Sequence, residues 1–184
     1  IDLHYDQLKE FFYLPNIRQT QGEVVHLMDK KLQKELAEKA GLRVARGWVV
    51  NIEDGKFSVP EGIEYPVFTK PEISIKFNKN CMKRCDNEAE LIGVIEDVAA
   101  QADCPILVEQ FIEIQKEYAV LGASDAQTSC IPGIITVKSM GNGPHKGVTL
   151  LGEYSALDAF GDLKARLQAF MKAVQLTGLF DIDL

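Results

Sequence analysis

Apolar residues recur every three or four positions in three parts of the chain, residues 29–41, 88–102 and 160–178. This spacing places them on one side of a helix, so each part is expected to form an amphipathic helix with one buried face. The expected faces are Leu32, Leu36 and Ala40, then Leu91, Val94, Ile95 and Val98, then Phe160, Leu163, Leu167, Phe170 and Val174. Residues typical of helix ends flank these parts: Asp29, Gly41, Asn87, Glu90 and Gly178.

Shorter apolar runs between turn-forming residues predict strands at 42–50, 65–70, 106–112, 118–121, 131–137 and 180–184. The run at 65–70 is expected to stop at Pro71, because proline has no amide hydrogen to donate to a sheet. Residues 1–25 have weak periodicity and are interpreted as a helix followed by a loop. Helices alternate with strands, and hairpin-like strand pairs follow in the second half, which favours an α+β fold over a doubly wound parallel sheet.

Composition narrows the class of protein. The chain has 184 residues, of which 46% are hydrophobic, and a net charge of −7. It contains no apolar run of about 18 residues, which argues against a membrane span, and its apolar content argues against disorder. The acidic balance argues against a nucleic-acid or anionic-membrane partner. Four cysteines without paired spacing fit reduced thiols in a cytoplasmic protein, and the composition suits either a monomer or a homodimer.

Two charged residues stand in otherwise apolar strands. Lys70 comes at the end of its run, where a half-buried ammonium would need an anionic partner. Glu109 alternates with Leu107 and Phe111, so its carboxylate shares a face with bulky apolar groups and could accept a hydrogen bond from a ligand amine. The alternatives are a lysine that extends to solvent and an edge-strand carboxylate that faces water.

Asp181 and Asp183 are two residues apart in the last predicted strand. In an extended chain they project from one face, roughly 7 Å apart. Mg²⁺ commonly takes one or two such carboxylates together with phosphate oxygens and waters. The alternative is a solvated acidic strand end.

Other reactive residues carry weaker signals. His26 and His145 lack metal-ligand spacing, and no serine or cysteine nucleophile pattern is visible. Cys81 and Cys85 could share a helical face, but metal binding there is disfavoured. The glycine-rich stretch 141–147 lacks the phosphate-loop pattern and is interpreted as a turn.

The succession of motifs resembles the ATP-grasp superfamily of carboxylate–amine ligases, over roughly residues 28–184. It is most similar to carbamoyl phosphate synthase, D-aspartate ligase and D-alanine–D-alanine ligase. The motifs that carry the resemblance occur in order at residues 28–32, 37–44, 65–71, 107–112, 117–120 and 178–183. It implies two α+β lobes with mainly antiparallel sheets that hold the nucleotide between them, at residues 28–112 and 113–184, after a lead-in segment of residues 1–27.

The resemblance also implies roles in the first lobe. Lys30 and Lys70 correspond to the two lysines that hold the ATP phosphates. Glu109 corresponds to the carboxylate that faces the adenine amino group. The backbone that contacts the base edge belongs to Gln110, Phe111 and Ile112.

In the second lobe, Glu117 corresponds to the acid that binds the ribose hydroxyls, and Asp183 to the first of three metal ligands. The other two ligands are expected beyond Leu184, because the chain ends in what resembles the middle of a strand. Lys138 corresponds to a basic residue near the γ-phosphate or the acceptor substrate, and is the candidate catalytic residue.

Two positions depart from the family pattern. Residues 72–80, where the family has a glycine-rich loop over the phosphates, contain no glycine, although Lys76 and Lys79 could contact phosphate instead. Asp181 stands where D-alanine–D-alanine ligases have an arginine, which disfavours that substrate.

The resulting hypothesis is an ATP- and Mg²⁺-dependent ligase that forms an acylphosphate from a small carboxylate and couples it to an amine. Two alternatives stay open: amine-independent phosphoryl transfer, and a non-catalytic nucleotide-binding or assembly module of the same fold. The piece given by this sequence is expected to bind nucleotide weakly and to turn over little.

Overall fold

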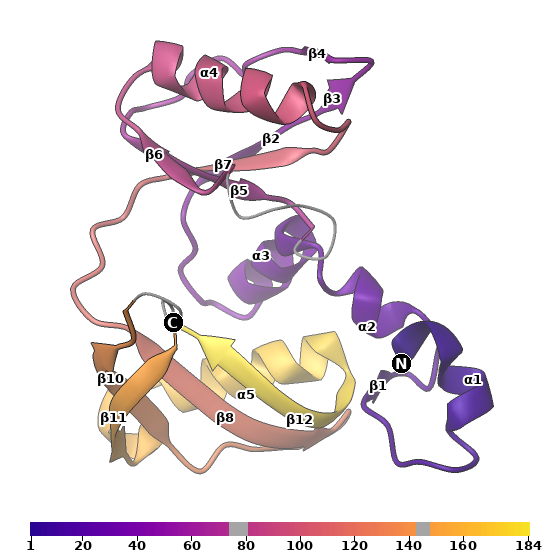
Figure 1. Ribbon diagram of the computed structural model, residues 1–184. Helices are drawn as coiled ribbons and strands as arrows, with labels where there is room; N and C mark the ends of the chain where they lie inside the picture. The colour runs from indigo at the N-terminus through magenta and orange to yellow at the C-terminus, as the bar shows by residue number, and fades with distance from the viewer. Residues whose placement is uncertain (74–80, 143–147) are drawn as a thin grey trace. The chain divides into compact units, whose positions relative to one another are not determined.

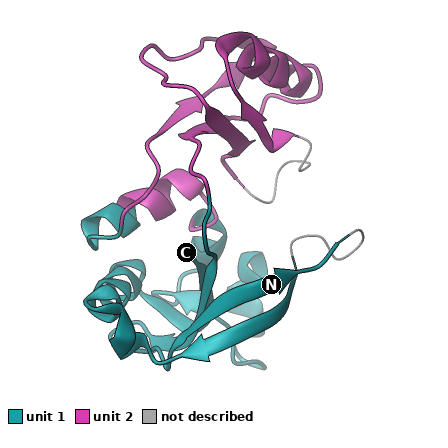
Figure 2. Cartoon of the chain, turned by 90° about the vertical axis from the view of Figure 1, so that its left-hand side faces the viewer, with its two compact units in different colours: residues 1–26, 36–42, 114–184 teal, residues 27–35, 43–113 magenta. Residues whose placement is uncertain are grey.

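The computed structural model describes residues 1–73, 81–142 and 148–184 (Figure 1). The chain divides into two compact units (Figure 2). Unit 1 comprises residues 1–26, 36–42 and 114–184, and unit 2 comprises residues 27–35 and 43–113. Within the described residues, no helix is long and apolar enough to cross a membrane. Lys76, Lys79 and His145 lie outside the described residues, as do most of the glycine-rich stretch and of the segment 72–80.

Unit 2 contains an antiparallel sheet with the strand order β2-β7-β5-β6. Its strands are β2 (Gly47–Val50), β5 (Val67–Pro71), β6 (Lys83–Cys85) and β7 (Ile106–Gln110). Helix α4 (Glu88–Ala99) covers one face, as Figure 1 shows. Alternate strand residues such as Val67, Ile106 and Val108 contribute to the core that also contains the predicted α4 stripe of Leu91, Val94, Ile95 and Val98.

The predicted start of α4 is confirmed in atomic detail. The Asn87 side chain accepts a hydrogen bond from the Glu90 amide at 3.0 Å, and the Glu90 carboxylate accepts one from the Asp86 amide at 2.8 Å. These bonds satisfy amides at the helix start that have no partner within the helix. The helix ends at Ala99, three residues earlier than the sequence predicted.

Strand β5 ends at Pro71, as predicted, but Pro71 is itself the last residue of the strand and pairs with Ile106. The Glu72 amide donates to the Pro105 carbonyl, so alternation turns the Pro71 nitrogen to the other side of the strand. On that side the pairing with β6 has already ended at Thr69 and Lys83. A missing donor therefore costs nothing at this position.

Helix α3 (Lys30–Lys39) begins at the predicted cap, since the Asp29 carboxylate accepts hydrogen bonds from the amides of Lys31 and Leu32. Its N-terminal turns belong to unit 2. Gly41 follows with a φ of +80°, a conformation that favours glycine after a helix. A two-stranded hairpin of β3 (Ile52–Glu53) and β4 (Lys56–Phe57) also belongs to unit 2.

Unit 1 contains a second antiparallel sheet with the order β1-β12-β8-β10-β11, in which β9 also pairs with β8. Its strands are β1 (Asn16–Ile17), β8 (Tyr118–Asp125), β9 (Ser129–Cys130), β10 (Ile134–Met140), β11 (Thr149–Ser155) and β12 (Leu176–Asp183). Helix α5 (Leu163–Val174) packs on one face (Figure 1), where Leu167 joins a core with Val120 and Ile134.

The third predicted helix is shorter than expected. Phe160 belongs to a separate 3₁₀ turn, η4 (Leu157–Phe160), and Gly161, with a φ of +62°, separates it from α5. The helix ends at Gln175 in a left-handed conformation, so Gly178 is not its end but part of β12. Strand β11 was not predicted, because nearly all of its residues are exposed and show no alternation between buried and exposed positions.

The first residues form short elements rather than the single helix that was expected. They are η1 (Asp2–His4), α1 (Tyr5–Leu8) and α2 (Glu23–His26), together with β1. The Val25 amide donates to the Asp2 carboxylate at 2.8 Å, which joins the two ends of this segment within unit 1.

Candidate functional site

Glu109 lies in unit 2 between two lysines. Its Oε2 is 2.5 Å from Nζ of Lys70, and its Oε1 is 2.7 Å from Nζ of Lys34. Only 8% of the residue is exposed. A carboxylate this buried is stable only when charged groups or hydrogen-bond donors satisfy it, and here two ammonium groups do so.

Lys30 adds a third positive charge. It lies one helical turn before Lys34 in α3, and its Nζ donates to the Pro71 carbonyl at 3.2 Å. Two lysines are thus paired with one carboxylate and a third lies within range of its charge, which leaves a formal local charge of +2 in a chain whose net charge is −7. Such a cluster is suited to an anionic ligand.

The pKa directions agree with this excess of positive charge. Burial lowers the pKa of Lys30, and the neighbouring charge of Lys70 lowers it further. Burial by itself raises the pKa of Glu109, but hydrogen bonds and charge from Lys34 and Lys70 outweigh it and leave the pKa below its ordinary value. An added anion would therefore relieve repulsion among the lysines.

Strand register explains how these residues meet. Ile106 and Val108 point into the core beneath α4, so Leu107 and Glu109 point to the opposite face. Lys70 pairs with Leu107 on the adjacent strand β5, which places it diagonally from Glu109. The N-terminal part of α3 lies on this second face and supplies Lys30 and Lys34.

Sequence reasoning found Lys30, Lys70 and Glu109 but missed Lys34. The available signal was its spacing, since residues four apart in a helix share a face with each other. Its importance became visible only when the structure placed Glu109 within reach.

Two of the three backbone amides after Glu109 are already hydrogen-bonded within unit 2. The Gln110 amide donates to the Arg46 carbonyl at 2.8 Å, and the Phe111 amide donates to the Pro66 carbonyl at 3.0 Å. Of these three amides, that of Ile112 alone has no hydrogen-bond partner in the described part of the chain. Of these three residues, Ile112 is thus the one whose amide is available to donate to a ligand, and contact of the three with a base edge stays a prediction.

Arg84 covers the ring of Phe111, with its guanidinium carbon 4.6 Å from the ring centroid. This cation–π contact fixes the ring beside the backbone that follows Glu109. The same guanidinium is paired with Asp86 at 2.6 Å.

The predicted carboxylates of unit 1 gather on one sheet face. Asp181 pairs with Leu121 and Asp183 with Ala119, while Phe180 and Ile182 point to the core beneath α5. Burial and the charge of Asp183 raise the pKa of Asp181, as expected for two like charges on one face. Within the described residues, no group of three or more histidine, cysteine, aspartate or glutamate side chains could hold a metal.

Glu117 precedes β8, and its carbonyl accepts a hydrogen bond from the Val137 amide at 2.9 Å. Leu184 and Tyr118 exchange two backbone hydrogen bonds, of 2.8 and 2.9 Å. Glu117 therefore continues the alternation of β8 on the side of Ala119 and Asp183. The two acids that the sequence predicted for ribose and metal, Glu117 and Asp183, therefore lie on the same face of the unit 1 sheet.

Lys138 occupies an irregularity of β10. Val137 pairs with Gly152 and Ser139 with Leu151, so Lys138 is an extra residue in a β-bulge. Its Nζ lies 2.5 Å from Oε2 of Glu153, and 47% of its side chain is exposed. The Lys138 ammonium is thus paired with Glu153 rather than with Asp181 or Asp183.

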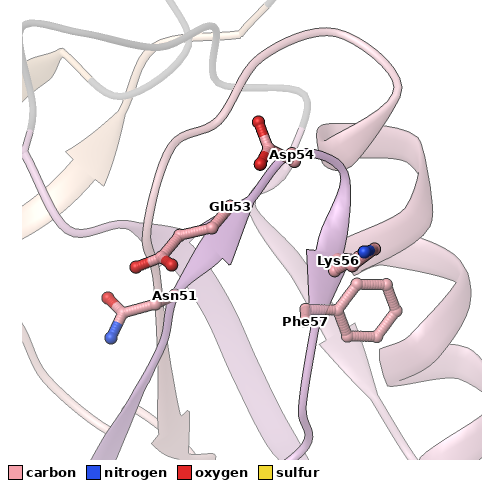
Figure 3. A pocket seen from close by; sticks show the side chains of 5 residues that line it. All are labelled: Asn51, Glu53, Asp54, Lys56 and Phe57. Atoms are coloured by element: carbon pink, nitrogen blue, oxygen red, sulfur yellow. The ribbon is translucent and has the colours of Figure 1, made fainter.

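An open pocket also occurs at the β3–β4 hairpin of unit 2 (Figure 3). It is lined by Asn51, Glu53, Asp54, Lys56 and Phe57. It shares no residue with the lysine cluster, and its mixed charges offer no comparable anion site.

Comparison with known proteins assigns a family. Residues 29–143 match the family described as the carbamoyl-phosphate synthase L chain, ATP binding domain. The chain belongs to this family. The match covers both Lys30 and Lys70, the Glu109 strand and Glu117. The family and the structural relatives described next show that the fold is the ATP-grasp fold, as the sequence predicted.

Curated relatives of this family member include D-alanine–D-alanine ligases. That of Natranaerobius thermophilus is 32% identical over 119 residues, which cover 59% of this chain and 31% of the relative. That of Bacillus cytotoxicus is 33% identical over 122 residues, covering 60% and 32%. The matched region thus spans about a third of the length of these relatives.

A solved structure agrees over most of the chain. D-alanine–D-alanine ligase from Bacillus anthracis complexed with ATP superposes with a TM-score of 0.68 at 16% identity, over 97% of this chain and 58% of that one. An L-amino acid ligase from Bacillus licheniformis gives 0.64 at 15% identity, over 100% and 42%. At this identity the likeness shows the fold.

Proposed function

We propose that the protein to which this chain belongs is an ATP-dependent ligase that joins a small carboxylate to an amine through an acylphosphate. The observation that carries the proposal is the cluster of Lys30, Lys34 and Lys70 around the buried Glu109. Membership of the family and the ligase names of its relatives support it.

Unit 2 would bind the base and the phosphates. Lys70 and Lys30 would neutralise the phosphate oxygens as point charges, which is the main requirement of phosphoryl transfer. Glu109, once released by Lys70, would accept a hydrogen bond from the adenine amino group. The Ile112 amide and the Gln110 carbonyl would supply a donor and an acceptor to the base edge.

Unit 1 would supply ribose and metal ligands. Glu117 would accept hydrogen bonds from the ribose hydroxyls, and Asp183 would donate an oxygen to Mg²⁺. The oxygen donors of Asp183 and Asp181 fit this hard cation, which usually takes only one or two protein carboxylates beside phosphate oxygens. Mg²⁺, when bound, would add positive charge at the phosphates.

The reaction needs these groups chiefly for positioning and charge neutralisation. An oxygen of the substrate carboxylate attacks the γ-phosphorus, an O–P bond forms, and the bond to the β–γ bridging oxygen breaks to release ADP. The amine nitrogen then attacks the acyl carbon, the bond to phosphate breaks, and the amine loses a proton. Lys138 would stabilise negative charge on the γ-phosphate or the acceptor after releasing Glu153.

Calorimetric titration with MgATP tests the binding part of the proposal. Lys70→Met is expected to weaken binding by about 1–3 kcal/mol, the usual effect of losing a charge-assisted contact. Lys39→Met, on the exposed C-terminal part of α3, is the matched control and should leave binding unchanged. Equal affinities for wild type and Lys70→Met would contradict this site.

The reaction is tested by ADP release from the whole protein that contains this chain. A ligase requires both a carboxylate and an amine for full turnover. ADP release that depends on a carboxylate alone would instead indicate amine-independent phosphoryl transfer, and binding without turnover would indicate a nucleotide-binding module.

A further inference from the structure

Lys34 is the most enclosed of the lysines paired with Glu109. Its side chain is 19% exposed, compared with 25% for Lys70. It donates to Oε1 of Glu109 at 2.7 Å and also to the backbone carbonyl of Ala45. Lys34 is therefore held at two points on different elements of unit 2, the strand β7 and the segment before β2.

Gly47 makes room for this ammonium. A Cβ atom at position 47 would lie 2.8 Å from Nζ of Lys34, 3.2 Å from the Val108 carbonyl oxygen and 3.3 Å from Cγ of Glu109. Gly47 pairs directly with Glu109 in the sheet, so any side chain there would occupy the space of the ion pair. The absence of a side chain at this position lets the lysine reach the carboxylate.

The carboxylate is divided between its two neighbours. Oε1 belongs to Lys34 and Oε2 to Lys70. Lys70 stands at the end of β5 and carries a role toward phosphate in the proposed function, whereas Lys34 is fixed by Ala45. When Lys70 turns to a phosphate, Oε2 becomes available and Oε1 stays bound.

We propose that Lys34 is a positioning residue that keeps Glu109 ionised and oriented, so that Oε2 can accept a hydrogen bond from the amino group of adenine. The inference rests on the proposed function and adds to it the residue that sets the preference for an amino-bearing purine. Lys34 itself contacts neither the base nor the phosphates.

The test compares ATP with inosine triphosphate, which carries a carbonyl oxygen where adenine has its amino group. Mg²⁺ complexes of both are titrated into the protein containing this chain, as wild type and as Lys34→Met. The wild type is expected to prefer ATP by about tenfold, the usual effect of one hydrogen bond to a charged group. In Lys34→Met this preference should fall to about twofold or less, chiefly through weaker binding of ATP.

A second variant, Gly47→Ala, displaces Lys34 without removing its charge and should reduce the ATP preference in the same way. Lys39→Met serves as the control on the same helix and should keep it. Thermal unfolding of each variant verifies that it is folded, and NMR titration of the Glu109 carboxyl should show a higher pKa in Lys34→Met.

The outcomes separate the two levels of inference. ATP binding with an unchanged preference in folded Lys34→Met and Gly47→Ala would overturn the role of Lys34 and leave the proposed function intact. No binding of either nucleotide by the wild type would overturn both. A parallel loss of affinity for the two nucleotides would show that Lys34 serves the fold or the phosphates, which also overturns the inference.

Discussion

The ammonium of Lys70 lies 2.5 Å from Oε2 of Glu109, across two adjacent strands of unit 2. Lys34 is paired with the other oxygen of the same carboxylate, so one negative charge is the counter-ion of two positive charges. Lys30 adds a third positive charge. Burial and the charge of Lys70 lower the pKa of the Lys30 ammonium. The cluster is positively charged before any ligand arrives, which explains how an acidic protein can attract a polyphosphate.

The first prediction concerns the pH dependence of stability. In the folded protein the pKa of Glu109 is below its ordinary value of 4.5. The ionised carboxylate therefore stabilises the fold fully above 4.5, and this effect is lost as the pH falls through the lower folded pKa. Glu109→Gln should flatten this part of the curve of unfolding free energy against pH.

At neutral pH the unfolding free energy of Glu109→Gln should be about 1–3 kcal/mol lower than that of the wild type, because two partly buried lysines lose their counter-ion. Glu96→Gln, on the exposed side of α4, is the control. Chemical denaturation at a series of pH values measures both the loss of stability at neutral pH and the change in its pH dependence. An acid dependence identical in wild type and Glu109→Gln would contradict the ion-pair description.

The second prediction concerns proton uptake on nucleotide binding. The pKa of Lys30 is lowered from its ordinary value of 10.5, and a bound phosphate would raise it again. MgATP binding should therefore take up protons at alkaline pH, and the affinity should fall as the pH rises through the lowered pKa. Calorimetry in buffers of different ionisation enthalpy measures this uptake, which Lys30→Met should remove.

The third prediction concerns the acidic face of unit 1. Burial and the charge of Asp183 raise the pKa of Asp181, so Asp183→Asn should lower it, as followed by NMR titration. In the whole protein the same variant should weaken Mn²⁺-ATP binding by at least roughly tenfold. The control is Asp158→Asn, because Asp158 is an exposed residue of η4. An unchanged affinity for Mn²⁺-ATP in Asp183→Asn would show that Asp183 is not a metal ligand.

The fourth prediction concerns the core of unit 2. Ile95 is completely buried beneath the sheet that carries Lys70 and Glu109. Ile95→Ala should cost about 2–5 kcal/mol of unfolding free energy through lost burial and the cavity left behind. Glu96→Ala, its exposed neighbour, should change stability by less than about 0.5 kcal/mol. Similar small effects for both would mean that α4 is not packed as described.

Local patterns predicted most of the regular structure. The caps at Asp29 and Asn87 and the buried stripe of α4 follow from side-chain spacing alone, and the structure confirms them. The end of β5 at Pro71 was predicted, but the pairing of Pro71 itself with Ile106 was not, because proline is tolerated there only where β6 has stopped pairing. Strand β11 was missed because its exposed residues carry no burial pattern. The lobe boundaries at 28–112 and 113–184, the lead-in segment and the individual site roles stay predictions.

The order of motifs along the sequence was enough to identify the fold, since residues such as Lys30, Lys70 and Glu109 keep characteristic positions relative to helices and strands. Which of these side chains contact one another depends on the tertiary structure. Lys34 is 75 residues from Glu109 along the chain, and Gly47 marks the space in which they meet. Sequence spacing determines local geometry because backbone hydrogen bonding is periodic, whereas ion pairs between distant segments depend on sheet register and packing.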